Sequence, residues 1–162
     1  SVSSACSRPA SSPSAFTLYL SYCPRIFAST VAFTFESESD NADKASLITD
    51  TGIMTDGMLS HIKGSSSVII EANHDVSLLM SGSYPYFLKA RIRGERGHLS
   101  NDDCAKACLS LLNEGTTSFM LAHLSSQNNT PEAAFGTVDA VLSGSGKKYT
   151  LKTALKNVPC AL

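Results

Sequence analysis

The sequence lacks any apolar run that approaches the ~20 residues needed to span a bilayer. It also lacks a strong net charge, because 13 Lys and Arg residues against 14 Asp and Glu residues leave a formal charge of −1. No global positive field therefore draws the chain to nucleic acid or to an anionic membrane, and we expect no membrane partner. Basic residues gather only locally, in a cluster that either grips phosphates or forms a solvated helix face: Lys89, Arg91, Arg93 and Arg96.

A C-x-x-C pair is missing too, and the five cysteines are odd in number. Cys104 and Cys108 lie one helical turn apart within an apolar stripe, so we expect buried free thiols there. No Cys or His stands near them at the spacing of a zinc site. Free thiols fit a reducing compartment, and the expected location is the cytoplasm.

The chain also has no glycine-rich loop that would cradle a phosphate. Gly52, Gly57 and Gly64 are too scattered to form one after the first strand. Gly144 and Gly146 precede two lysines rather than a lysine followed by Ser or Thr. These positions argue against a flavodoxin-like nucleotide binder.

Acidic residues are absent before Glu36, and seven of the first fourteen residues are Ser. Such a stretch buries little apolar surface, so we expect residues 1–30 to form a disordered or non-homologous tail. Two alternatives stay open, an organelle transit segment and a sequence altered by a wrong start or a shifted reading frame. The folded domain is expected over residues 31–162, a length that suits one core.

From Val31 onward the apolar pattern alternates between strands and helices, which predicts an α/β layer that opens with a hairpin. Ser100 and Thr130 are good helix N-caps, and Pro131 suits a first helical position. The expected strands are 31–35, 45–49, 68–71, 118–122 and 148–152, and the expected helices are 55–62, 76–80, 85–92, a segment between Ser100 and Gly115, and 130–142.

Three of the expected strands end in polar residues that carry chemistry. Asp50, Glu71 and His123 close or follow successive strands. The carboxyl ends of strands in α/β sheets are where ligands collect, so this pattern predicts a metal or hydrolytic site. His98, at the loop that enters the helix capped by Ser100, is placed to contact a phosphate or a metal-bound anion.

Each of these residues also has a plain structural interpretation. His98 alone fits an exposed loop histidine, and His123 fits a core histidine with its hydrogen bonds satisfied. Asp50 before Thr51 fits an Asx turn. The functional interpretation therefore depends on the residues acting together.

Taken together, the motifs resemble the C-terminal half of metallo-β-lactamase-fold hydrolases, and most closely the bacterial YycJ/WalJ-like group of DNA-processing exonucleases. Their order is also similar to that in transfer-RNA 3′-processing endonucleases. The resemblance covers 31 to about 142 and is carried by Thr49-Asp50-Thr51-Gly52, Ile70-Glu71-Ala72-Asn73-His74-Asp75, Arg96-Gly97-His98-Leu99-Ser100-Asn101, Leu121-Ala122-His123-Leu124-Ser125 and Asn128-Asn129-Thr130-Pro131-Glu132.

The resemblance implies half of an αββα sandwich, a mixed sheet flanked by helices, and a site with two divalent metal ions, zinc or manganese. It implies that Asp50 bridges the metals and that His123 is the last metal ligand. His98 would be the catalytic histidine beside the scissile phosphate, and Glu71 would orient His98. His74 and Asp75 would line the same rim, and the partner would be nucleic acid, most directly DNA.

The chain departs from this family in its metal ligands. It contains neither the H-x-H-x-D-H motif nor the further histidine expected shortly before Val31, and its four histidines are His61, His74, His98 and His123. We therefore expect a fragment that is inactive alone, with a non-catalytic half-domain that acts as an interaction module as the alternative. Half of a sandwich would leave a sheet face bare, which predicts self-association.

Overall fold

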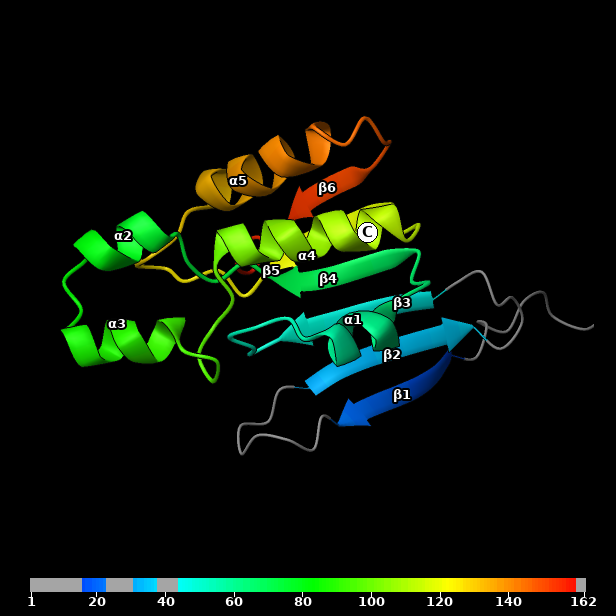
Figure 1. Cartoon of the computed structure of the whole chain (residues 1–162), viewed down its shortest axis with the longest axis horizontal. Helices are drawn as coiled ribbons and strands as arrows, with labels where there is room; N and C mark the ends of the chain where they lie inside the picture. The colour runs from blue at the N-terminus through cyan, green and yellow to red at the C-terminus, as the bar shows by residue number, and fades with distance from the viewer. Residues whose placement is uncertain (1–15, 23–30, 38–43, 160–162) are drawn as a thin grey trace, which may run out of the picture.

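The computed structural model describes residues 16–22, 31–37 and 44–159, and these form one six-stranded sheet with helices packed against it (Figure 1). The sheet order follows the chain, from β1 to β6. The strands are β1 (Phe16–Tyr22), β2 (Val31–Ser37), β3 (Lys44–Thr49), β4 (Ser67–Glu71), β5 (Ser118–Ala122) and β6 (Thr150–Thr153). The helices are α1 (Asp56–Ile62), α2 (Val76–Ser81), α3 (Tyr86–Arg93), α4 (Asn101–Asn113) and α5 (Pro131–Ser143).

The sheet changes from antiparallel to parallel pairing at β3. β1, β2 and β3 pair antiparallel, whereas β3, β4, β5 and β6 run parallel to one another. Parallel strands end at the same edge, so the residues that follow β3, β4 and β5 meet there. Figure 1 shows the arrowheads of β3 and β4 pointing toward the end of the molecule where α2 and α3 lie.

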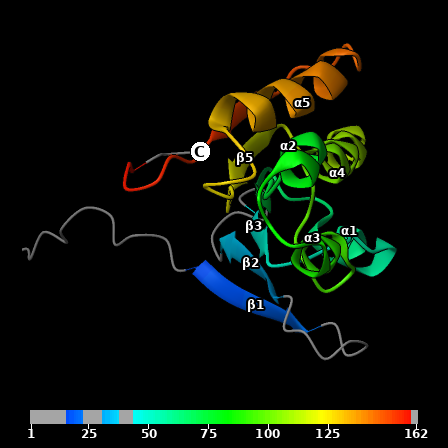
Figure 2. The ribbon, with the colours of Figure 1, turned by 90° about the vertical axis from the view of Figure 1, so that its left-hand side faces the viewer.

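The core lies between one face of the sheet and the helices α1, α4 and α5 (Figure 2). Ile48, Ile70 and Leu121 are neighbours in register on that face, and each is fully buried. Burying a side chain of this size stabilises the fold by roughly 1.5–3 kcal/mol. Helix α4 contributes the stripe predicted from its spacing, including Cys104, Cys108 and Leu111.

Cys104 and Cys108 are free and buried, as the sequence predicted, with their Sγ atoms 4.0 Å apart. The Sγ contact with Cys108, together with burial, raises the pKa of the Cys104 thiol well above its usual range. These thiols therefore behave as apolar core groups. The other cysteines lie outside the described residues.

No described helix covers the opposite face of the sheet (Figure 2). Phe33, Leu47 and Ile69 are paired in register across β2, β3 and β4, and each is only half-buried. Successive residues of a strand point to opposite faces, which places these three away from the core that Ile48 and Ile70 join. We call Phe33, Leu47 and Ile69 the uncovered face.

The predicted α/β layer with a hairpin at its start is confirmed, and most element bounds agree to within one or two residues. Thr55, Ser100 and Thr130 each accept a hydrogen bond from a first-turn N–H of α1, α4 and α5. The last strand begins at Thr150 rather than at Lys148. No helix among the described residues has the length and apolar character to cross a membrane.

One segment of the expected tail belongs to the sheet. Phe16–Tyr22 forms β1 and pairs along its whole length with β2, so disorder does not describe these seven residues. Alternating apolar residues in Phe16–Tyr22 supply the strand pattern, which the surrounding Ser-rich sequence obscured. Residues 1–15 and 23–30 lie outside the described residues, and the domain boundary at residue 30 stays a prediction.

Candidate metal centre

Asp50, Glu71 and His123 meet at the carboxyl edge of the parallel strands, each at or directly after the end of β3, β4 or β5. Asp50 has a φ of 59° and His123 a φ of 56°, both in the left-handed region. Residues other than glycine seldom adopt this conformation, and such backbone strain clusters at functional sites. The two strand-end turns therefore hold both side chains in fixed directions.

A single buried carboxylate organises the site. Glu71 is fully buried, and its Oε1 accepts hydrogen bonds from His98 Nδ1 at 2.8 Å and from His123 Nδ1 at 2.7 Å. Its Oε2 accepts the backbone N–H of Thr51 at 3.0 Å. When Nδ1 of each imidazole donates to this carboxylate, the Nε2 atoms keep their lone pairs for a metal or a substrate.

Asp50, His98 and His123 form the only group of three or more metal-ligating side chains among the described residues, with one ligand atom from each lying within 4.8 Å of the others. We call these three residues the metal cluster. Asp50 Oδ1 is 3.9 Å from the Nδ1 atom of each histidine, and the two rings meet edge to face at a centroid distance of 5.3 Å. One carboxylate and two imidazoles suit zinc or manganese, so the donor set fits one divalent cation.

The protonation of His98 follows from its neighbours. The hydrogen bond to Glu71 raises the pKa of His98 above its usual value, although partial burial opposes that rise. The charges of Glu71 and Asp50 add to the increase. Without a cation, His98 therefore holds its proton to a higher pH than a free histidine does.

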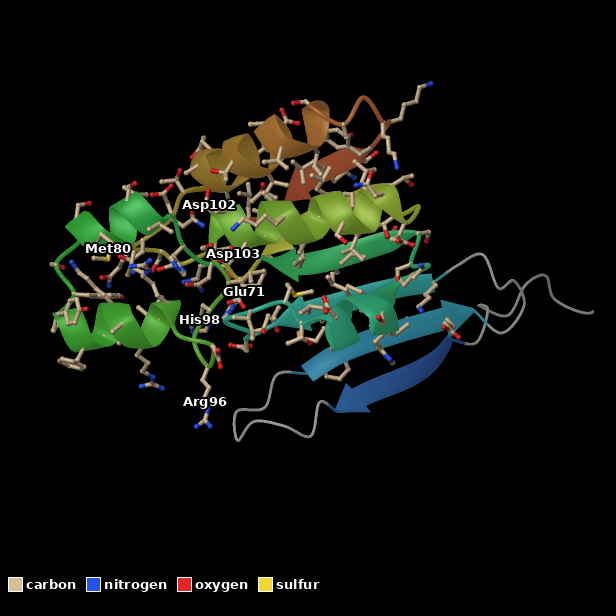
Figure 3. The ribbon with its side chains drawn as sticks, in the orientation of Figure 1. Glu71, Met80, Arg96, His98, Asp102 and Asp103 are labelled. Carbon is tan, nitrogen blue, oxygen red and sulfur yellow. The ribbon has the colours of Figure 1, made fainter. Side chains whose placement is uncertain are left out.

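The metal cluster opens into a pocket of about 350 Å³ whose walls come from five loops and from α3. The pocket is lined by Asp50, Asn73, Tyr84, Ile92, His98, His123, Leu124, Ser125, Ser126 and Asn128. Figure 3 shows Glu71 and His98 at the end of the sheet that faces α3. A reacting group bound in this pocket would reach all three side chains of the metal cluster.

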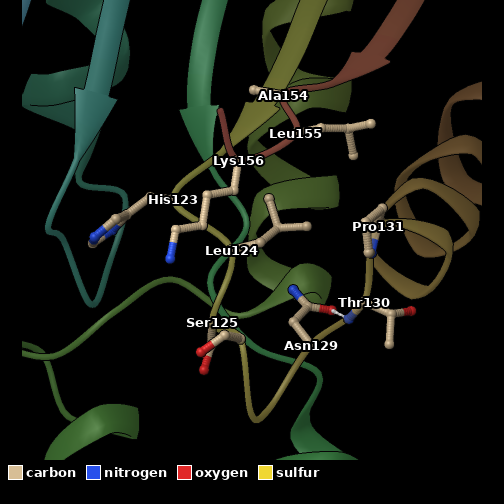
Figure 4. Close-up of a pocket in the computed structure, with 10 residues that line it drawn as sticks. His123, Leu124, Ser125, Asn129, Thr130, Pro131, Ala154, Leu155 and Lys156 are labelled. Carbon is tan, nitrogen blue, oxygen red and sulfur yellow. Dashed lines mark hydrogen bonds between the residues drawn. The ribbon is translucent and has the colours of Figure 1, made fainter. Parts of the chain in front are cut away.

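A second pocket, of about 520 Å³, adjoins the first along the loop that follows β5 (Figure 4). It shares residues 123–126 with the first pocket and continues to the N-terminus of α5 and the segment after β6. Its lining residues are His123, Leu124, Ser125, Ser126, Asn129, Thr130, Pro131, Ala154, Leu155 and Lys156.

Two glycines allow the loops around the metal cluster to approach closely. A Cβ atom at Gly52 would lie 2.0 Å from the carbonyl oxygen of Gly94, and one at Gly97 would lie 2.1 Å from that of Ile92. His98 N–H donates to the same Ile92 carbonyl at 2.8 Å. The end of α3 thus fixes the backbone from which His98 reaches Glu71.

Three buried asparagines join the loops, and the sequence pattern predicts no role for any of them. Asn73 donates its side-chain N–H to the carbonyl of His123 at 2.9 Å. Asn101 and Asn129 exchange two side-chain hydrogen bonds, at 3.0 and 2.8 Å, and Asn129 also donates to the carbonyl of Ala72. Their only signal in the sequence was their place inside the recognised motifs, since such pairing depends on loops far apart in the chain.

Neither His74 nor Asp75 lines either of the two pockets at the metal cluster, and their expected place at the rim of the site stays a prediction. His74 is 1 % exposed, and neither ring nitrogen has a hydrogen-bond partner among the described residues. Burial lowers the pKa of His74, and the nearby charge of His98 lowers it further. The Asp75 carboxylate caps α2 by accepting the N–H of Leu78 at 2.9 Å.

Comparison with known proteins finds relatives over much of the chain, although no family model matches. The chain is 41 % identical over 112 residues to "Exodeoxyribonuclease YycJ" of Bacillus anthracis. The aligned residues make up 69 % of this chain and 42 % of the relative. The chain is 46 % identical over 92 residues to "Exodeoxyribonuclease WalJ" of Streptococcus pneumoniae, which covers 57 % of this chain and 34 % of that protein. The chain thus spans about two fifths or less of the length of these curated relatives.

A solved structure supports the fold. The chain resembles the structure described as zinc-bound PqqB from Methylobacterium extorquens with a TM-score of 0.52 and 13 % sequence identity, covering 91 % of this chain and 47 % of that one. The likeness concerns the fold alone. It agrees with the α/β layer expected of one part of a metallo-β-lactamase-type sandwich.

Proposed function

Because the matched part of the chain belongs to the YycJ/WalJ group of the metallo-β-lactamase fold, we propose that the metal cluster is one part of a metal-dependent site for phosphodiester hydrolysis in DNA. The observation that carries the proposal is the shared carboxylate. Glu71 holds two imidazoles beside Asp50, at the strand ends where ligands collect. Both relatives are named exodeoxyribonucleases, which supports DNA as the substrate class.

Within this site we assign Asp50 and His123 as metal ligands. Both are exposed at the mouth of the pocket, and both sit on left-handed backbone that fixes their direction. A divalent cation there would be zinc or manganese, and it would supply a water of lowered pKa together with positive charge for the phosphate. Glu71 holds His123 in the tautomer that offers Nε2 as a ligand.

His98 is the proposed catalytic histidine. It is half-buried and lines the pocket, and its hydrogen bond to Glu71 raises its pKa above the usual value. A protonated imidazole in this place donates to a phosphate oxygen or to the leaving oxygen. Replacing Glu71 would therefore change both the pKa of His98 and the direction of its ring.

The two assigned ligands, Asp50 and His123, are too few for the two cations of the family site, so we propose that the chain is inactive alone and that the remaining ligands come from elsewhere. The uncovered face offers a surface on which another part of a sandwich would pack. The same face supports the second candidate function, a non-catalytic half-domain that binds a partner. Free buried thiols at Cys104 and Cys108 fit a reducing location, and we propose the cytoplasm.

Metal content of the purified chain tests the proposal. Elemental analysis after dialysis is expected to find zinc or manganese in the wild type and to lose it in an Asp50→Ala/His123→Ala variant. Asp102→Ala/His61→Ala removes the same two side-chain types away from the metal cluster and should keep the metal. Equal metal in all three proteins, or none in the wild type, would contradict the assignment of the ligands.

A further inference from the structure

Helix α3 exposes two aromatic side chains that cover no part of the core. Tyr86 is 79 % exposed and Phe87 is 74 % exposed, more than any other large apolar side chain among the described residues. None of the α3 residues is fully buried. Large apolar groups kept in water in this way mark an interaction surface.

The same helix carries positive charge. Residues 86–96 contain four basic residues and one acidic residue, a net charge of +3 in a chain whose net charge is −1. Lys89 donates to the carbonyls of Met80 at 2.6 Å and Gly82 at 2.7 Å, which ties α3 to the end of α2. Arg91 and Arg93 are exposed.

Cations and rings share the surface of α3. Phe87 and Arg91 are four residues apart, so they are neighbours on the helix. Tyr86 and Arg93 are seven residues apart, two turns along one face. Each ring therefore has a guanidinium on its own side of the helix.

This surface leads into the pocket of the metal cluster. Ile92, between the two arginines, lines that pocket, and its carbonyl accepts the N–H of His98 at 2.8 Å. Figure 3 shows Arg96 extending from the loop between α3 and His98. A chain of phosphates lying along α3 would thus arrive at His98.

We propose that α3 is a platform for single-stranded nucleic acid, on which unpaired bases stack on Tyr86 and Phe87 while Arg91 and Arg93 contact the phosphates. Stacking on aromatic rings combined with a basic surface is the usual way in which proteins hold single strands without reading sequence. In a duplex the faces of the bases stack on neighbouring base pairs, so they are not open to stacking on Tyr86 and Phe87. The inference rests on the proposed function for one point, that the bound nucleic-acid strand ends at the metal cluster.

Binding without catalysis tests the platform. Fluorescence anisotropy with labelled oligo(dT), oligo(rU) and a hairpin duplex, in EDTA, measures affinity independently of any metal. We expect single strands to bind more tightly than the duplex, and Tyr86→Ala/Phe87→Ala to weaken oligo(dT) binding about 10- to 100-fold. Tighter binding of oligo(dT) than of oligo(rU) assigns DNA, and the reverse assigns RNA.

Matched variants away from α3 serve as controls. Phe135→Ala/Val141→Ala removes two exposed apolar side chains and should leave the affinity unchanged. Arg91→Gln/Arg93→Gln should reduce the slope of log Kd against log salt by about 1.4, from about 0.7 per phosphate contact on a single strand. Lys147→Gln/Lys148→Gln, which removes two exposed cations elsewhere, should leave the slope unchanged.

A fluorescent reporter keeps the test decisive if an alanine variant fails to fold. The chain contains no tryptophan, so Phe87→Trp introduces a single indole. Its emission should be quenched by oligo(dT), whereas that of Phe135→Trp should not. Equal quenching at both positions, no quenching at either, or equal affinity for duplex and single strand would overturn the platform. A chain that binds no metal yet still binds oligo(dT) would overturn the proposed function alone.

Discussion

At the scale of single residues, Glu71 decides the geometry of the site, because both histidines of the metal cluster donate to the same oxygen atom. We expect Glu71→Gln to weaken zinc binding about 10- to 100-fold, the range seen when the groups that orient metal-binding histidines are replaced. The amide keeps the size of the side chain but removes the charge that holds two Nδ1–H donors. Competition with a chromophoric chelator measures the affinity.

Glu132→Gln, an exposed position in the first turn of α5, makes the same chemical change away from the site. Its zinc affinity should equal that of the wild type. If Glu71→Gln also binds zinc as the wild type does, the shared carboxylate does not organise the ligands.

His74 makes stability depend on pH. Burial lowers its pKa below the ordinary value of 6.5, so the unfolded chain binds the proton more readily than the folded chain. The free energy of unfolding that His74 contributes is therefore full above pH 6.5 and is lost as the pH falls toward the lowered pKa. His98 has a raised pKa and contributes with the opposite sign, so the comparison must be made between variants that differ only at residue 74.

We expect a His74→Leu variant to lose less unfolding free energy than the wild type between pH 7 and pH 5. Urea denaturation at each pH measures the difference. Since neither ring nitrogen has a hydrogen-bond partner in the described part of the chain, removing the ring leaves no partner group there unsatisfied. Parallel pH profiles for the two proteins would show that His74 is not the group responsible.

At the scale of elements, the sequence predicted what depends on neighbours along the chain. The caps Ser100 and Thr130 and the periodic stripe of α4 located the helices, and polar strand ends identified Asp50 and His123 as neighbours. Contacts between distant loops could not be predicted, such as the pairing of Asn101 with Asn129 or the second histidine on Glu71. The burial of His74 was missed because a polar motif residue gives no local sign of the core around it.

The loops that carry Asp50 and His98 meet at Gly52, which makes that contact a test of how the elements position the site. A methyl group in Gly52→Ala would overlap the backbone of Gly94 and Glu95. We expect a loss of about 2 kcal/mol of unfolding free energy, in the range of overpacked sites, together with weaker metal binding. Denaturation and chelator competition measure the two effects.

Gly57→Ala is the matched control, because the nearest atom to its new methyl group would be Thr55 Oγ1 at 3.8 Å. Gly57 is the second residue of α1, and alanine in this first turn should stabilise the chain, by less than the roughly 1 kcal/mol of a helix interior. If both glycine variants lost stability equally, the close approach at Gly52 would not explain its effect.

At the scale of the whole molecule, the proposed shortage of metal ligands and the uncovered sheet face belong to one description. The helices cover the face that carries Ile48 and Ile70, whereas Phe33, Leu47 and Ile69 remain half-exposed on the other. The chain also spans only about two fifths or less of the curated relatives' length. A layer that packs against another in a sandwich would thus be open at both its uncovered face and its site.

The uncovered face therefore predicts self-association that depends on concentration. We expect light scattering after size exclusion to show a molar mass above that of the 17.1 kDa monomer at micromolar to millimolar concentrations, falling on dilution.

Phe35 lies on the same face as Phe33, two residues along β2, and is 38 % exposed. Phe35→Lys should shift the protein toward monomer by placing a charge there, whereas Ile53→Lys, at a loop residue that is 36 % exposed, should not. A monomer at every concentration would mean that the half-exposed apolar row is tolerated in water. Equal shifts in both variants would locate the association outside this face.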